Sequence, residues 1–262
     1  MLNETGLSGL LAGCRLGKPL SCRETVDSTN LEVCRAAGQG APEGLLVQAE
    51  EQTAGRGRRG RSWLSPPGEN LYFSLLLRPD IDPEKTHMLT PLMALAVAKS
   101  ARSLGIDALI KWPNDVVARG HKLCGILTEL HLEAEGFYVV IGTGINVNQR
   151  SFPEGLHEAT SLCLEKGSGI DREELLARVL RCFEECYGRF LETQDLSGLR
   201  AGYEALLVNR GRTVEVLDPK GAWKGEALGI LDTGELLVRR SDGTKEAVFA
   251  GEVSVRGIYG YV

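Results

Sequence analysis

The sequence is poor in the features that mark membrane, secreted and metal-centred proteins. No apolar run approaches the length that a helix needs to span a bilayer. The N-terminal stretch MLNETGLSGLLAG lacks the basic segment and the long apolar segment of a secretory signal peptide. The seven cysteines are scattered without a CxxC pair, and the four histidines form no HExxH motif. These absences predict a cytoplasmic protein with reduced thiols and without a structural metal site built from side chains.

An excess of positive charge is also missing. The chain has 30 basic and 35 acidic residues, which give a net charge of -5 and a pI near 5.6. Because a general polyanion binder is usually basic, this balance argues against nucleic-acid binding. The 262 residues are 43% hydrophobic and 25% charged, which suffices for one main core and a small second domain.

Against this background, the stretch QTAGRGRRGRSW (Gln52–Trp63) concentrates arginine and glycine, and we call it the Gly-Arg loop. It has no apolar face and neither helical nor strand periodicity, so we expect a loop. Glycine lets the backbone approach a ligand closely, and guanidinium groups match phosphate and carboxylate oxygens. We interpret the stretch as a mobile anion clamp.

Three other interpretations of the Gly-Arg loop stay open at this point. The spacing Gly55-x-Gly57-x-x-Gly60 matches the dinucleotide fingerprint, although Ser62–Pro67 cannot supply the helix that must begin inside that motif. The arginines are also compatible with a nucleic-acid patch, or with a solvated loop that has no role.

Asp27-Ser28-Thr29-Asn30 precedes a run predicted to be helical, 31–37. Hydroxyl side chains at such a position commonly cap the helix. They can instead present hydroxyls and helix-end amides to a polar ligand. The residues alone leave both possibilities open.

A second polar motif, Lys111-Trp112-Pro113-Asn114-Asp115, follows a short apolar strand. Asparagine and aspartate there are compatible with a plain turn, whereas two charged groups beside a tryptophan favour a ligand pocket. Lys122 begins a further strand, 121–129. We expect that strand to pair with the one containing Asp115, so that both side chains enter the same cleft.

The rest of the pattern predicts two regions. A buried strand at 137–146 ends in Gly142-x-Gly144-Ile145-Asn146, where the glycines indicate close approach by a ligand or another backbone. An amphipathic helix is predicted over Asp171–Thr193, with Asp171 as its N-cap. Short alternating strands joined by Gly turns then predict a small antiparallel barrel. We therefore place domains at 1–208 and 209–262.

These motifs, in this order, resemble the biotin protein ligase family, the biotin–[acetyl-CoA-carboxylase] ligases. The resemblance extends from about residue 22 to the C-terminus. It implies an α+β fold, in which a mixed, largely antiparallel sheet of the class II synthetase and biotin–lipoate ligase type packs against helices and is followed by an SH3-like barrel. The matching segments are 27–30, Gln52-Thr53-Ala54-Gly55-Arg56-Gly57-Arg58-Arg59-Gly60-Arg61, 111–115, Lys122-Leu123-x-Gly125-Ile126-Leu127-x-Glu129 and 142–146.

The resemblance implies a two-step reaction. Biotin and ATP first form biotinyl-5′-adenylate with release of pyrophosphate, and the biotinyl group then passes to one lysine of a biotin carboxyl carrier protein of a carboxylase. A carboxylate that attacks an anionic phosphate needs cations to offset charge repulsion. Closure of the Gly-Arg loop would exclude water and protect the mixed anhydride. The implied cofactors are ATP, biotin and Mg²⁺.

The family pattern also implies residue roles. Arg56 and Lys122 are expected to reach the biotin carboxylate and the α-phosphate, Arg58 the activated intermediate, and Asp115 is the fourth catalytic residue. The expected biotin-binding residues are Ser28, Thr29, Asn30, Gln52, Gly55, Arg56, Arg58, Lys122, Gly125 and Gly142. The expected nucleotide-binding residues are Arg58, Arg61, Trp63, Lys111, Asn114, Asp115 and Asn146. Asp115 is the expected Mg²⁺ ligand, because magnesium on ATP phosphates needs few protein carboxylates.

Departures from the family pattern are informative. Many members have an N-terminal helix-turn-helix, but only about two dozen residues precede the Ser28 motif, so a DNA partner is not expected. No membrane partner is expected either, because the chain has no long apolar run. Some relatives have a tryptophan in the adenine-binding loop, and residues 149–162 contain none. Some relatives form homodimers and others do not, which leaves the oligomeric state open.

Three rival functions differ in what they require. A lipoate ligase would lack the Gly-Arg loop in this form. A nucleic-acid-binding regulator would need a second basic surface. A biotin-binding protein without catalytic activity would have no need of Lys122 or Asp115.

Overall fold

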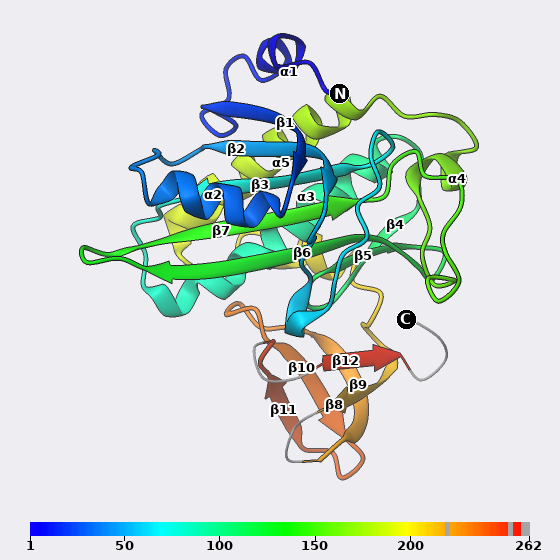
Figure 1. Ribbon diagram of the computed structural model, residues 1–262. Coiled ribbons are helices and arrows are strands. Elements are labelled where there is room, and N and C mark those ends of the chain that lie inside the picture. Colours follow the sequence, from blue (N-terminus) through cyan, green and yellow to red (C-terminus); the bar gives the residue numbers. More distant parts are fainter. Residues whose placement is uncertain (218–220, 251–253, 258–262) are drawn as a thin grey trace.

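The computed structural model describes residues 1–217, 221–250 and 254–257, the last four by their backbone alone. The C-terminal end of the predicted second domain, residues 258–262, lies outside the described residues. Figure 1 shows a large unit, in which helices cover a sheet on both faces, and a smaller unit of strands beneath it.

The large sheet has seven strands in the order β1-β2-β3-β7-β6-β5-β4. The β1 and β2 strands are parallel, and every other neighbouring pair is antiparallel. This mixed, largely antiparallel sheet confirms the predicted fold class. The strands are β1 (Leu20–Val26), β2 (Leu46–Gln52), β3 (Leu71–Leu77), β4 (Ala108–Lys111), β5 (Asp115–Ala118), β6 (His121–Leu132) and β7 (Phe137–Ile145).

Helices cover both faces of this sheet. The α3 and α5 helices pack together on one face, and α2 lies on the other above a small core of its own (Figure 1). All seven residues of β3 are buried, as expected for a strand with both faces covered. The helices are α1 (Glu4–Leu10), α2 (Thr29–Ala37), α3 (Leu89–Arg102), α4 (Leu162–Lys166), α5 (Arg172–Thr193) and α6 (Arg200–Glu204), with 3₁₀ turns η1 (Arg58–Gly60) and η2 (Pro83–Met88).

The prediction for α5 is confirmed, because the Asp171 carboxylate accepts the backbone N–H of Glu174 at 3.0 Å. Residues 1–24, to which the sequence pattern assigned no helix or strand, contain α1 and most of β1. No helix among the described residues combines the length and the apolar composition that crossing a bilayer requires.

The small unit is a five-stranded sheet in the order β11-β10-β9-β8-β12, with antiparallel neighbours. Its buried interior includes Val214, Ala227, Leu236 and Val238. The antiparallel strands predicted for this region are therefore present. Their bounds are β8 (Thr213–Leu217), β9 (Trp223–Ile230), β10 (Leu236–Arg240), β11 (Lys245–Val248) and β12 (Ser254–Gly257).

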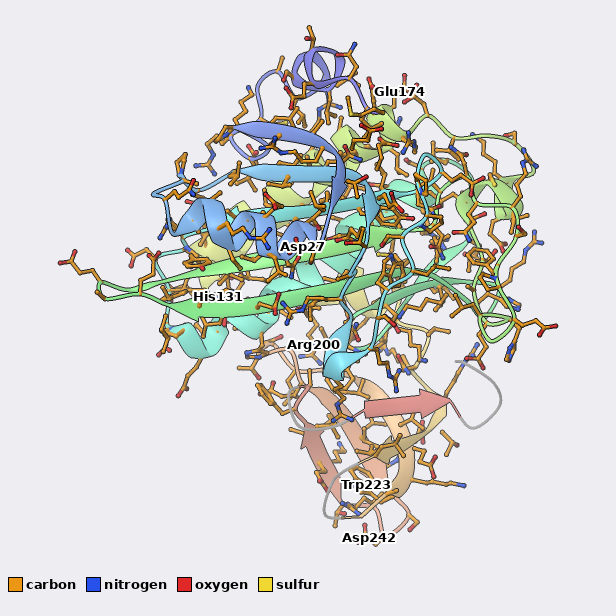
Figure 2. The ribbon with its side chains drawn as sticks, in the orientation of Figure 1. Asp27, His131, Glu174, Arg200, Trp223 and Asp242 are labelled. Carbon is orange, nitrogen blue, oxygen red and sulfur yellow. The ribbon has the colours of Figure 1, made fainter. Side chains whose placement is uncertain are left out.

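The two units meet at the turn between β9 and β10. The indole N–H of Trp112 donates to the Gly234 carbonyl at 3.1 Å, and the backbone N–H of Trp112 donates to the Asn209 side chain at 2.9 Å. Arg200 pairs with Asp232 at 3.3 Å, and Figure 2 places Arg200 at this junction. The β4–β5 turn thus makes a direct hydrogen bond to the small unit.

Candidate active site

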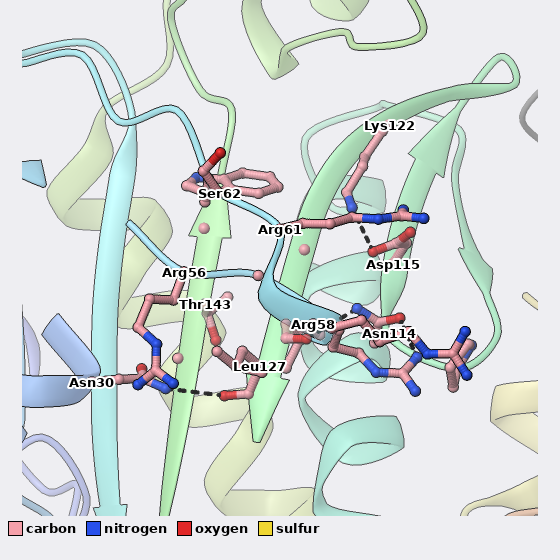
Figure 3. A pocket seen from close by; sticks show the side chains of 18 of the residues that line it. Asn30, Arg56, Arg58, Arg61, Ser62, Asn114, Asp115, Lys122, Leu127 and Thr143 are labelled. Carbon is pink, nitrogen blue, oxygen red and sulfur yellow. Dashed lines mark hydrogen bonds and ion pairs between the residues drawn. The ribbon is translucent and has the colours of Figure 1, made fainter. Parts of the chain in front are cut away.

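Most of the predicted site residues line a single cavity of about 350 Å³ (Figure 3). Its walls come from the start of α2, the end of β2, the Gly-Arg loop, the β4–β5 turn, β6 and β7. Cavities of this size accept small-molecule ligands. The predicted residues in the lining are Ser28, Thr29, Asn30, Gln52, Arg56, Arg58, Arg61, Trp63, Lys111, Asn114, Asp115, Lys122, Gly125 and Gly142.

Gly55 and Asn146 are not among the described residues that line this cavity. A Cβ on Gly55 would lie 2.4 Å from the Trp63 carbonyl oxygen, so a glycine is required by the path of the loop itself. The Asn146 side chain donates to the Thr160 carbonyl at 3.0 Å. Ligand contacts by these two residues stay predictions.

The Gly-Arg loop folds back on itself. The N–H of Gly57 donates to the Arg61 carbonyl at 2.7 Å, and the N–H of Trp63 donates to the Gly55 carbonyl at 2.9 Å. Both bonds enclose η1, a single 3₁₀ turn at the tip of the loop. Within residues 52–63, all of which are described, no α-helix begins, so the dinucleotide interpretation is wrong.

Positive charge gathers at one end of the cavity. The Lys122 Nζ lies 2.8 Å from the Asp115 Oδ1, because β5 and β6 pair as predicted. Arg61 extends toward the same pair (Figure 3). Arg58 donates to the Asn114 Oδ1 at 3.1 Å and to the Ala250 carbonyl of the small unit. Burial, followed by the neighbouring Arg59, lowers the pKa of Arg58, and Asp115 opposes this effect. Such a cluster favours an anionic ligand.

Hydroxyl and amide groups occupy the other end. The Gln52 Oε1 accepts both the backbone N–H and the hydroxyl of Thr29, at 2.9 and 3.1 Å. The Ser74 hydroxyl donates to the Asn30 Oδ1 at 2.6 Å. Ser28 is the N-cap of α2, yet its side chain makes no capping hydrogen bond to the described residues. The capping interpretation of Ser28 is therefore wrong.

At three glycines, the absence of a side chain leaves room for a side chain from another part of the protein. A Cβ on Gly142 would lie 2.0 Å from the Asn30 Oδ1, and one on Gly144 would lie 2.5 Å from the Trp63 indole. A Cβ on Gly125 would lie 2.8 Å from the same ring. The close approach expected at Gly142 and Gly144 is present. The Trp63 ring therefore packs against Gly125 of β6 and Gly144 of β7, and Trp63 also lines the cavity.

Arg56 and Lys122 point to different ends of the cavity. Figure 3 shows Arg56 extending toward Asn30, whereas Lys122 faces Asp115. The Arg56 guanidinium lies 3.2 Å from Glu129, a residue of β6. Convergence of Arg56 and Lys122 on one ligand group therefore stays a prediction.

Some residues of the site were not singled out from the sequence. Glu158 lines the cavity, but it lies in an irregular segment without a motif. Ser74 is fully buried beside Asn30, and its only signal was a hydroxyl within an apolar strand. Among the described residues, no three His, Cys, Asp or Glu side chains gather as a metal cluster. The carboxylates in the lining are Asp115 and Glu158.

The mixed sheet and the attached small sheet together hold a cavity with a cationic end and a polar end, which suits a small anionic ligand. The family model described as the Biotin/lipoate A/B protein ligase family matches residues 24–146. A second model, the Biotin protein ligase C terminal domain, matches residues 211–256. The chain belongs to the biotin/lipoate A/B protein ligase family, which confirms the resemblance inferred from its motifs.

Similar proteins support this assignment. The bifunctional ligase/repressor BirA of Bacillus spizizenii is 39% identical over 245 residues, which cover 92% of this chain and 75% of the relative. The biotin–[acetyl-CoA-carboxylase] ligase of Mycobacterium tuberculosis is 35% identical, with 96% and 95% of the two chains covered. The structure of the biotin protein ligase from Aquifex aeolicus in complex with biotin and ATP has a TM-score of 0.79 at 32% identity, with 92% and 99% covered.

Proposed function

We propose that the protein is an ATP-dependent biotin protein ligase that forms biotinyl-5′-AMP, releases pyrophosphate and transfers biotin to one lysine of a biotin carboxyl carrier protein. The observation that supports this most directly is the Lys122–Asp115 pair, 2.8 Å apart, in the same cavity as the polar groups of Ser28, Thr29 and Gln52. Relatives named as biotin–[acetyl-CoA-carboxylase] ligases, and a similar structure that contains biotin and ATP, support the substrates.

In the first step, a biotin carboxylate oxygen bonds to the α-phosphorus of ATP, and the bond to pyrophosphate breaks. Both reactants are anionic, so fixed cations must stabilise the charge that develops. We assign this role to Lys122, Arg58 and Arg61, which surround Asp115 and Asn114. Ser28, Thr29 and Gln52 would bind the ureido ring at the polar end.

The acidic residues of the lining fit Mg²⁺ bound to ATP. Magnesium prefers oxygen ligands and retains water and phosphate oxygens, so about one or two protein carboxylates suffice. We assign Asp115 as the protein ligand, and Glu158 is the other carboxylate of the lining. The metal would supply neutralising charge on the phosphates.

In the second step, the amine of the carrier lysine bonds to the acyl carbon of the intermediate, and AMP leaves. The ammonium group must first lose a proton, and Asp115 and Glu158 are the carboxylates of the lining that are available to accept it. We also propose that residues 1–208 form the catalytic domain and residues 209–262 the C-terminal domain. We propose that the protein is cytoplasmic.

The test is to mix the protein with biotin, Mg-ATP and an isolated biotin carrier domain. Intact-mass analysis should show one biotinyl group on the carrier. A carrier whose acceptor lysine is replaced by arginine should stay unmodified, as should a reaction without ATP. Modification with lipoate but not with biotin would contradict the proposal, and so would the absence of any mass gain.

A further inference from the structure

Glu129 contacts two residues of the cavity lining through separate oxygens. Its Oε2 accepts the side-chain N–H of Asn30 at 2.6 Å, and its Oε1 lies 3.2 Å from the guanidinium of Arg56. Asn30 belongs to the first turn of α2, Arg56 to the Gly-Arg loop and Glu129 to β6. One carboxylate on a strand therefore connects a helix to the loop.

The Asn30 side chain has a single suitable orientation. Its Nδ2 faces Glu129 and the Leu127 carbonyl, which are both acceptors, and its Oδ1 accepts from Ser74. Asn30 is 3% exposed, and the lack of a side chain at Gly142 makes room for it. Without Glu129, the Nδ2 would retain only the Leu127 carbonyl at 3.5 Å, which is long for a hydrogen bond. The amide would then be poorly satisfied and free to reorient.

The contact with Arg56 restrains a glycine-rich segment. The Arg56 side chain is 45% exposed and Glu129 is 19% exposed, so the pair is partly solvated and adds little to overall stability. Its main effect is therefore local, on a loop whose glycines allow a wide range of backbone conformations. A guanidinium has five N–H donors, so Arg56 can bind Glu129 and still face a ligand.

We propose that Glu129 is a positioning residue for this cavity. One oxygen fixes the amide of Asn30 beside the hydroxyl groups of the polar end, and the other restrains the Gly-Arg loop through Arg56. The proposal rests on the proposed function in one respect only, which is that biotin serves as the test ligand.

Two substitutions separate the two contacts. Glu129→Gln keeps an oxygen that can accept from Asn30 but removes the charge that attracts Arg56. Glu129→Ala removes both contacts. Glu133→Ala is a matched control, because Glu133 follows directly after the same strand and forms its ion pair with Arg78, at 2.6 Å. Biotin affinity by calorimetry measures the Asn30 contact, and the initial rate of trypsin cleavage within residues 56–61 measures the loop restraint.

Glu129→Gln should change the biotin Kd by less than about 2-fold and raise the cleavage rate about 5-fold, whereas Glu129→Ala should also weaken biotin about 10-fold. Glu133→Ala should change neither. Equal loss of biotin affinity in the Gln and Ala variants would overturn the proposal, as would unchanged cleavage in the Gln variant. Failure of the parent to bind biotin would refute the proposed function instead, and the cleavage rates would still decide whether Glu129 restrains the loop.

Discussion

At the scale of single residues, three cationic side chains of the cavity have partners within the protein. Lys122 pairs with Asp115, Arg58 with Asn114, and Arg56 with Glu129. Long flexible side chains lose conformational freedom when they bind a ligand. Because these contacts already restrict the three side chains, ligand binding reduces their conformational entropy by a smaller amount.

The clearest prediction at this scale concerns Lys122. Lys122→Met keeps most of the side-chain bulk and removes the ammonium that lies 2.8 Å from Asp115. We expect pyrophosphate release with biotin and ATP to fall by about 100-fold or more, the usual cost of losing one group that stabilises developing charge. Biotin affinity should change less than about 5-fold, because biotin without ATP does not yet develop that charge.

Lys99→Met, on α3, is the control for a lost surface charge, and it should leave pyrophosphate release unchanged. A normal rate of pyrophosphate release in Lys122→Met would refute the role of Lys122. A loss confined to biotin affinity would reassign the residue to ligand binding alone.

The positions of several site residues were predictable from the sequence, because they depend on strand pairing. Lys122 was expected to face Asp115 because their strands should pair, and the pairing brings the two charges together. The side chain that approaches Gly144 was not predictable in this way. The answer is the indole of Trp63, which lies about 80 residues earlier in the sequence, and no local pattern encodes such a contact.

At the scale of elements, the long periodic segment of α5 and the short strands between Gly turns were predicted, whereas α1 and β1 were missed. The 22-residue α5 has an apolar face and a capping aspartate, both visible in the sequence. The missed α1 has seven residues, and it is held by an Asn3 cap and by packing against α5. The missed β1 lies at the sheet edge and alternates little, since most of its residues are partly or fully exposed. Tertiary contacts, rather than local pattern, stabilise these elements.

Glu50 gives a prediction about how α5 and the N-terminal segment are attached to the sheet. It lies on β2, is 4% exposed, and accepts from the Leu2 backbone and from Arg172, both at 2.9 Å. Burial raises the pKa of Glu50, but the Leu2 N–H and Arg172 outweigh it, and the pKa is lowered overall. The unfolded chain therefore binds this proton at a higher pH, so the stabilisation is present above the ordinary Glu pKa and is lost as the pH falls below it.

Glu50→Gln should lower the free energy of unfolding at neutral pH by about 3 kcal/mol, because Arg172 loses its counter-charge in a buried setting. The difference from the parent should shrink between about pH 5 and pH 3. Urea unfolding across this range is the measurement, with the exposed Asp107→Asn as control. A difference that stays constant with pH would show that Glu50 is not the titrating group.

At the scale of the whole molecule, the small unit supports the turn that contributes Lys111, Asn114 and Asp115 to the cavity. Trp112, the first residue of that turn, is 1% exposed and donates its indole N–H to the Gly234 carbonyl. The motif alone suggested a tryptophan in a ligand pocket. The structure shows that Trp112 both lines the cavity and joins the two units. The strands of the small unit were predictable from their turns, whereas this attachment depends on residues 122 positions apart.

The two ends of the cavity should respond differently when this attachment is weakened. Trp112→Phe keeps an aromatic side chain and removes the hydrogen bond to Gly234. The cationic end should be affected, because Lys111, Asn114 and Asp115 adjoin Trp112 in the chain. The polar end is built from α2, β2, β3 and β6, so it should be preserved. We therefore expect the KM for ATP in pyrophosphate release to rise about 5-fold, while biotin affinity stays within about 2-fold.

Trp223→Phe is the matched control, because Trp223 lies on the small unit against Arg240, with 3.7 Å between the guanidinium carbon and the ring centroid. It should leave both constants unchanged. If Trp112→Phe weakened biotin as strongly as it raised the KM for ATP, the cavity would respond as one rigid body, and the small unit would not selectively support the nucleotide end. If neither constant changed, the bond between Trp112 and Gly234 would serve only to hold the two units together.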